Sequence, residues 1–281
     1  MGSSKRAKVW RRTRVGGSIA AAVAALVWVS AQPGGEVFVL AVGTLLGLLS
    51  VYECCAIGVL GRGVGVVCAA LAVLGTAGLL YNPVAFDPPQ LAAFAFAAVC
   101  AGFTRLGPGP RVERPSWLLP SGLALLLAIS MPGLYALRLG WGIDGLIVLL
   151  VLAKSGDIAG YYVGNAMGKT HPFPKISPGK TTAGCVGSLI AGGLIGVAFQ
   201  TAGMFPGARL GLFSGLLAGL LVNVAAQAGD LFESWVKRRV GVKDSGTWFG
   251  PSGGVLDLID SFLFAVPVAL LSWPLLFNQV P

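Results

Sequence analysis

The 281-residue sequence has few charged side chains: only 11% of its residues are Asp, Glu, Lys or Arg, whereas 55% are hydrophobic. Roughly a quarter of the residues of an average soluble domain are charged. The mean hydropathy of +0.80 departs equally far from that of soluble proteins. These values exclude a soluble globular fold, so we expect the apolar residues to face lipid.

Metal-binding and redox patterns are also missing. His171 is the single histidine, and the five cysteines lie in or beside apolar runs without metal or redox spacing, so we interpret them as small hydrophobic residues. The loops are too short for a separate soluble domain. We expect one membrane domain over residues 1–281, with N-terminal helices in 1–144 and catalytic helices and loops in 145–281.

Long apolar runs alternate with short polar breaks along the whole chain, a pattern typical of transmembrane helices. The sequence therefore predicts an all-α, polytopic membrane bundle of about nine transmembrane helices. The runs fall at residues 15–31, 37–52, 64–80, 90–104, 117–137, 145–163, 182–204, 210–233 and 255–277.

Lysine and arginine are unevenly distributed among the breaks between these runs. Cytoplasmic loops of membrane proteins collect Lys and Arg, and a cytoplasmic N-terminus places 17 of the 20 on that side. We therefore predict a cytoplasmic N-terminus, with "VSA" at 29–31 leaving a cleaved signal peptide as a less favoured alternative. The net charge of +9 is spread over separate loops, which argues against a nucleic-acid partner. The inside segments are 1–14, 53–63, 105–116, 164–181 and 234–254.

Carboxylates are scarce, and their placement is the most informative feature of the sequence. Ionisable groups at membrane depth persist mostly where they line a polar cavity or meet a partner. Acids 230 and 233, and likewise 257 and 260, are three residues apart, so each pair shares one helix face. Six of the 11 acids lie late in the chain, from residue 157 onward: Asp157, Asp230, Glu233, Asp244, Asp257 and Asp260.

Two interpretations of these acids remain open. Asp157 either pairs with Lys154, one helical turn away, or lines a polar site. Asp230 and Asp257 are either solvated helix ends or partners of the cations in the loop between them. Two carboxylates beside a basic, glycine-rich turn suit Mg²⁺ and phosphates, so we favour the second interpretation and predict Asp230 and Asp257 as Mg²⁺ ligands.

Two inner loops offer groups that bind phosphate. Residues 176–181, "ISPGKT", place Lys180 and Thr181 just before a predicted helix N-terminus, where a phosphate is favoured. A near P-loop at 164–170 has the wrong spacing and follows no strand. The later loop combines cations with glycines that lead into the ninth run, whose N-terminal amides also favour an anion: Lys237, Arg238, Lys243, Gly253 and Gly254.

The later loop and its flanks resemble the C-terminal signature of phosphatidate cytidylyltransferases, also called CDP-diacylglycerol synthases. That signature reads S-x-x-K-R-x4-K-D and then H-G-G-x-x-D-R-x-D, with Ser252 here in place of the histidine and Leu258 in place of the arginine. "SGDIAGYYVG" at 155–164, "ISPGKT" at 176–181 and "GDLFES" at 229–234 resemble other elements of the family, in the same order. The matching residues are Ser234, Lys237, Arg238, Lys243, Asp244, Gly253, Gly254, Asp257 and Asp260.

The resemblance implies an enzyme that joins CTP and phosphatidate to give CDP-diacylglycerol and pyrophosphate, with Mg²⁺ as cofactor. It implies a site facing the cytoplasm of a bacterial inner membrane, and it leaves the oligomeric state open, with a homodimer as one option. The implied catalytic residues are Asp157, Asp230, Asp257 and Asp260. The implied substrate-binding residues are Ser177, Lys180, Thr181, Lys237, Arg238, Lys243, Asp244, Ser252, Gly253 and Gly254.

Three other functions fit the sequence less well. A CTP-dependent lipid kinase of the polyprenol or phytol type shares the membrane setting but transfers the terminal phosphoryl group. A transporter tends to place its charges near the midplane, whereas here the acids gather toward one face. A degenerate, non-catalytic relative is suggested by Ser252 and Leu258.

Overall fold

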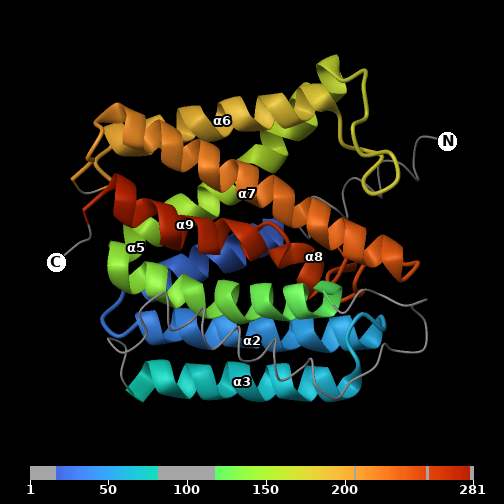
Figure 1. Cartoon of the computed structure of the whole chain (residues 1–281). Coiled ribbons are helices and arrows are strands. Elements are labelled where there is room, and N and C mark those ends of the chain that lie inside the picture. Colours follow the sequence, from blue (N-terminus) through green and yellow to red (C-terminus); the bar gives the residue numbers. More distant parts are fainter. Residues whose placement is uncertain (1–16, 82–117, 206, 251–252, 279–281) are drawn as a thin grey trace.

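The computed structural model describes residues 17–81, 118–205, 207–250 and 253–278, and its regular structure there is helical. A single β-bridge joins Ala208 to Phe277 within these ranges. The all-α class is therefore confirmed. The helices, side by side in Figure 1, are α2 (Glu36–Ala56), α3 (Arg62–Tyr81), α5 (Leu118–Met167), α6 (Thr182–Thr201), α7 (Leu212–Arg239), α8 (Val255–Ile259) and α9 (Phe262–Leu276).

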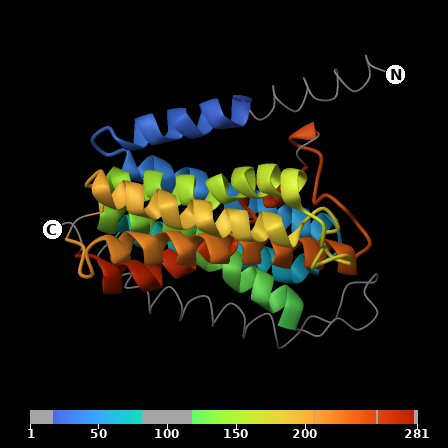
Figure 2. The ribbon, with the colours of Figure 1, turned by 90° about the horizontal axis from the view of Figure 1, so that it is seen from above.

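Much of the bundle is long and apolar enough to cross a membrane. Five such segments are found in the described chain: Glu36–Ala56, Ser130–Met167, Thr182–Thr201, Leu212–Arg239 and Val255–Leu276. Two shorter apolar helices are Gly17–Ser30, which flanks the bundle in Figure 2, and Arg62–Leu74. These segments coincide with the predicted runs, except that the run at 90–104 lies outside the described residues. The chain is an integral membrane protein.

α5 contains two of the predicted spans. Its 50 residues are interrupted at Gly142, where φ is 67° and ψ is −166°. Glycine adopts this left-handed region without the steric penalty that a Cβ carries. Figure 1 shows the chain reversing direction at this break, so the predicted runs at 117–137 and 145–163 lie on opposite sides of a glycine turn.

The span predicted at 255–277 is present as Val255–Leu276, and within it the regular helix is interrupted at Asp260 and Ser261, between α8 and α9. Asp260 Oδ1 accepts hydrogen bonds from the backbone N of Ser261 at 2.5 Å and from Ser261 Oγ at 2.9 Å. Local bonds of this kind from Asp and Ser compete with the helical ladder.

Glycines allow α6 and α7 to approach closely. A Cβ on Gly219 would overlap the backbone carbonyl of Gly192, and a Cβ on Gly196 would overlap that of Gly215. Small residues of this kind bring helix backbones together in membranes. The close contact fixes the second half of α6 against the first half of α7.

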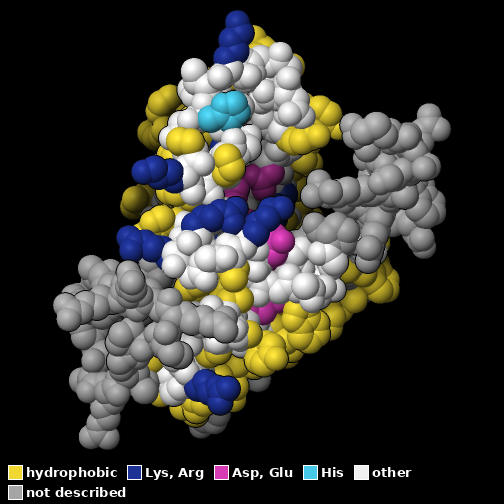
Figure 3. Space-filling model, turned by 90° about the vertical axis from the view of Figure 1, so that its right-hand side faces the viewer, with side chains coloured by type: hydrophobic (Ala, Val, Ile, Leu, Met, Phe, Trp, Pro, Cys, Tyr) yellow, Lys and Arg dark blue, Asp and Glu magenta, His cyan; other side chains and the backbone are white. Residues whose placement is uncertain are grey.

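The helix ends that carry the basic loops gather at one end of the bundle, on the right in Figure 1. The C-terminal ends of α2, α5 and α7 lie there, with the N-terminal ends of α3, α6 and α8. The predicted inside segments 53–63 and 164–181, and the described part of 234–254, therefore share one side. In Figure 3, which faces this end, Lys and Arg side chains surround a few acidic ones.

Candidate active site

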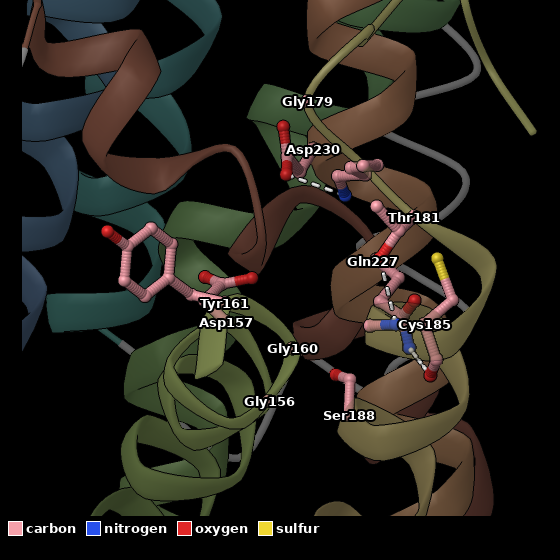
Figure 4. Close-up of a pocket in the computed structure, with 12 residues that line it drawn as sticks. Gly156, Asp157, Gly160, Tyr161, Gly179, Thr181, Cys185, Ser188, Gln227 and Asp230 are labelled. Atoms are coloured by element: carbon pink, nitrogen blue, oxygen red, sulfur yellow. Dashed lines mark hydrogen bonds and ion pairs between the residues drawn. The ribbon is translucent and has the colours of Figure 1, made fainter. Parts of the chain in front are cut away.

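A cavity of about 250 Å³ lies between α5, α6 and α7 near this end of the bundle. Its walls carry polar groups from all three helices and from the loop before α6. Figure 4 shows Asp157 of α5 on one side and Gln227 and Asp230 of α7 on the other. Lys180 and Thr181 complete the wall at the start of α6. The cavity joins two polar motifs, at 155–164 and 229–234, whose acids Asp157 and Asp230 are more than 70 residues apart in the sequence.

Asp230 is paired with a lysine, so the interpretation as a solvated helix end is wrong for this residue. Its Oδ2 lies 2.7 Å from Lys180 Nζ, and its Oδ1 accepts a 3.4 Å hydrogen bond from Ser234 Oγ. Both side chains of the ion pair are about a quarter exposed or less. Thr181 caps α6, since its hydroxyl accepts a 3.1 Å hydrogen bond from the backbone N of Gly184. The loop before α6 is thereby fixed against α7.

The alternative ion pair between Asp157 and Lys154 is also wrong. Lys154 Nζ instead lies 3.3 Å from Asp260 Oδ1 and donates a 3.1 Å hydrogen bond to Ser261 Oγ. The break between α8 and α9 brings these acceptors to α5. Asp157 is exposed to the cavity that it lines.

Asp257, at the start of α8, is held by four donors. Its Oδ2 accepts hydrogen bonds from the backbone N of Gly254 at 2.6 Å and from the backbone N and Oγ of Ser245, both at 2.9 Å. Lys237 Nζ is in close contact with Oδ1, and it lies 2.6 Å from Glu233 Oε2. Asp257 is therefore a paired carboxylate in a fixed orientation and not a solvated helix end.

Glu53 is a member of this cluster that the sequence did not reveal. It is 2% exposed, and its carboxylate accepts hydrogen bonds from Ser245 Oγ at 2.7 Å, Val255 N at 2.8 Å and Leu256 N at 2.9 Å. These donors are about 190 to 200 residues away in the sequence, so no local pattern could predict them. The available signal was a single acid directly after an apolar run, where an ionisable group in a membrane protein can indicate a site.

The expectation that the amides of this helix receive a substrate anion needs correction. The first amides of α8 and the one before it bind the chain's own carboxylates, Glu53 and Asp257. The glycines serve this arrangement: Gly253 has φ +85°, and a Cβ on Gly254 would overlap the Glu53 carboxylate. The glycine-rich turn therefore accommodates the Glu53 carboxylate of the chain itself, in the place where a substrate anion was expected.

α7 contacts α8 and the residue that follows it at two points. A Cβ on Gly229 would overlap the backbone carbonyl of Asp260, and Lys237 meets Asp257 two turns further along α7. Asp230 follows Gly229 directly, and Asp257 lies one turn before Asp260. Asp230 pairs with Lys180 at the cavity and Asp257 pairs with Lys237, so the two carboxylates belong to separate ion pairs on neighbouring helices.

The remaining predicted residues are distributed over the two loops. Arg238 joins the loops, because it donates hydrogen bonds to the carbonyls of Ile176 at 3.3 Å and Val242 at 2.9 Å. Lys243 and Asp244 are exposed, and Ser177 is half-buried. Ser252 lies outside the described residues.

Comparison with known proteins decides the family. The model of the cytidylyltransferase family matches residues 10–275. The chain belongs to the cytidylyltransferase family. It is 38% identical over 127 residues to the phosphatidate cytidylyltransferase of Bacillus subtilis (strain 168), covering 45% of this chain and 46% of that protein. It is 40% identical over 112 residues to the phosphatidate cytidylyltransferase of Aquifex aeolicus (strain VF5), covering 40% of each.

A further relative is the uncharacterized protein YnbB of Escherichia coli (strain K12), with 42% identity over 122 residues, 43% of this chain and 40% of that protein. The matched regions thus span less than half the length of these curated relatives. The family membership covers almost the whole chain, whereas the similarity to individual enzymes is partial.

Proposed function

We propose that this chain is a phosphatidate cytidylyltransferase, which joins CTP and phosphatidate to give CDP-diacylglycerol and pyrophosphate. The observation that carries the proposal is the gathering of the signature acids and lysines at one end of the bundle, beside a cavity between α5, α6 and α7. The names of its cytidylyltransferase relatives support the same reaction. A cytidylyltransferase needs this combination because its soluble substrate is a triphosphate and its lipid substrate stays in the bilayer.

The residues at the site fit Mg²⁺, which prefers carboxylate oxygens together with phosphate and water oxygens. Asp230 and Asp257, on adjacent helices, would hold the ion, with Asp157 and Asp260 shaping the site. No group of three or more His, Cys, Asp or Glu side chains converges within the described ranges. Substrate phosphates would then supply further ligands. When bound, the ion would neutralise developing negative charge on the triphosphate.

The lysines have a second role in this proposal. Lys180 and Lys237 now supply the positive charge that Asp230 and Asp257 require. A cation bound with the triphosphate would supply that charge instead, which would release both ammonium groups to phosphate oxygens. Arg238, Lys243 and the hydroxyl groups at the start of α6 are further candidates for phosphate contacts.

The reaction requires no general base. The second pKa of a phosphate monoester is near 6, so the phosphatidate phosphate is already an anionic nucleophile at neutral pH. Its oxygen attacks the α-phosphorus of CTP, a new phosphorus–oxygen bond forms, and the bond to pyrophosphate breaks. The contribution of the chain is alignment and charge neutralisation. Replacement of the family histidine by Ser252 is compatible with this chemistry.

We also propose an orientation of the chain in the membrane. Nine spans with a cytoplasmic N-terminus would place the basic end of the bundle, and hence the cavity, at the inner face of a bacterial cytoplasmic membrane. CTP would arrive from the cytoplasm and phosphatidate from the inner leaflet. A homodimer is compatible with this arrangement.

The experiment that tests the function follows the phosphorus atoms of CTP. Purified protein in detergent is incubated with phosphatidate, Mg²⁺ and CTP labelled at either the α- or the γ-phosphorus. We expect the α-label in lipid and the γ-label in pyrophosphate. A γ-label in lipid would indicate a CTP-dependent lipid kinase. Intact CTP in both reactions would contradict the proposal and favour a non-catalytic relative or a transporter.

A further inference from the structure

Glu53 is the one acid of the cluster that comes from the N-terminal half of the described chain. It lies in the last turn of α2, is 2% exposed, and accepts three hydrogen bonds of 2.7 to 2.9 Å. A buried carboxylate is costly unless donors surround it. All three of its donors belong to the segment 245–256, which also contains Gly254.

These contacts fix the surroundings of Asp257. Ser245 Oγ lies between the two acids, 2.7 Å from Glu53 Oε2 and 2.9 Å from Asp257 Oδ2. Val255 N and Leu256 N, the first amides of α8, reach Glu53 immediately before Asp257 in the chain. Glu53 thus holds both the helix start that carries Asp257 and the serine that orients its carboxylate.

Two glycines of this segment pack directly against the Glu53 carboxylate. A Cβ on Gly246 would lie 2.5 Å from Glu53 Oε1, and a Cβ on Gly254 would overlap both carboxylate oxygens. The segment therefore closes directly on Glu53. A helix start that only needed a cap could use a local side chain or water.

We propose that Glu53 is a positioning residue of the active site, which acts through Ser245 and the start of α8 to hold Asp257 in its metal-binding orientation. This inference rests on the proposed cytidylyltransferase reaction. It also gives the N-terminal helices a part in the chemistry, because α2 supplies the anion on which the catalytic segment closes. Substitution of a residue that hydrogen-bonds to a metal ligand typically lowers metal affinity or activity by about 10- to 100-fold.

The test compares Glu53→Gln with Glu36→Gln, a matched change at the opposite end of α2. A Gln amide presents an N–H group where three donors converge, so it cannot keep all three bonds. We expect Glu53→Gln to lower kcat and to raise the Mg²⁺ concentration for half-maximal activity by about tenfold or more. The KM for phosphatidate should stay unchanged, and Glu36→Gln should behave as wild type.

A second readout does not depend on turnover. Mg²⁺ with CTP should raise the melting temperature of wild type more than that of Glu53→Gln. A purely structural Glu53 would lower the melting temperature and the yield but would leave kcat, the Mg²⁺ requirement and the size of this shift unchanged. That result would overturn the inference.

Ser245→Ala provides the coupling test. If Glu53 acts through Ser245, the losses caused by the two substitutions will be less than additive in the double variant, whereas additive losses would overturn the inference. If Glu53→Gln yields no folded protein, Ser245→Ala alone decides, and an unchanged Mg²⁺ requirement would count against the inference. If wild type transfers no label, that result contradicts the proposed function and not the inference. The melting-temperature shifts of wild type and Glu53→Gln with Mg²⁺ and CTP can still be compared in that case, and equal shifts would overturn the inference.

Discussion

Lys237 supplies the positive charge between two carboxylates. Its Nζ lies between the carboxylates of Glu233, which is 1% exposed, and Asp257. Removing one partner of a buried ion pair leaves an uncompensated charge and costs about 3–5 kcal/mol. We therefore expect Lys237→Met to lower stability by about that amount, measured by unfolding in detergent.

The matched control for that change is Lys243→Met, at an exposed position of the following loop. It should leave the unfolding midpoint unchanged. Because the cost comes from the unpaired acids, adding Glu233→Gln to Lys237→Met should recover part of the lost stability. Equal stability of Lys237→Met and wild type would show that the acids find other partners.

Lys180 tests the substrate side of the same argument. Its ion pair with Asp230 is partly exposed, so the fold should tolerate Lys180→Met. Hydrogen bonds to charged groups are worth about 1.5–3 kcal/mol, so loss of a phosphate contact should raise the KM for CTP about tenfold or more. Lys175→Met, at an exposed position of the same loop, is the control. Similar KM values for CTP in both variants would show that Lys180 does not contact the triphosphate.

At the scale of elements, the α6–α7 contact sets the distance between the two halves of the cavity. Gly219→Val would push a side chain into the Gly192 carbonyl, and overpacking of this kind costs about 1–3 kcal/mol. Lys180 would then move away from Asp230, so kcat should fall further than stability alone explains. Ala198→Val, at an exposed position of α6, is the control. Full activity of Gly219→Val would show that the cavity does not depend on this contact.

The elements also show what a sequence can and cannot reveal. Apolar runs and signature residues are local properties, so the described spans and the pairing of Asp257 with Lys237 could be predicted, whereas the Lys180–Asp230 pair could not. The contact between Lys154 and Asp260 could not be predicted, because the two residues are 106 positions apart in the sequence. The role of Glu53 could not be predicted either, because its hydrogen-bond donors are distant in the sequence. They become neighbours only when α2 packs against α8, and the residues beside Glu53 in the sequence do not indicate them.

At the scale of the whole molecule, the proposed function requires the basic end of the bundle to face the cytoplasm. The five native cysteines are replaced, and single cysteines are introduced at Lys243 and at Arg209, which lie at opposite ends of α7. In intact cells an impermeant maleimide should label the cysteine at 209 and not the one at 243. Labels at 243 alone would reverse the orientation, and with it the proposed access of CTP.

The most direct measurement of the central claim is the transfer of α-label from CTP to lipid by Asp230→Asn and Asp257→Asn beside wild type. If these carboxylates hold the metal and the triphosphate, both variants should lose about 100-fold or more of kcat while remaining folded. Asp144→Asn, at an exposed acid near the turn of α5, should keep full activity. Transfer by either variant at the wild-type rate would contradict the claim that acids from α7 and α8 together form the site.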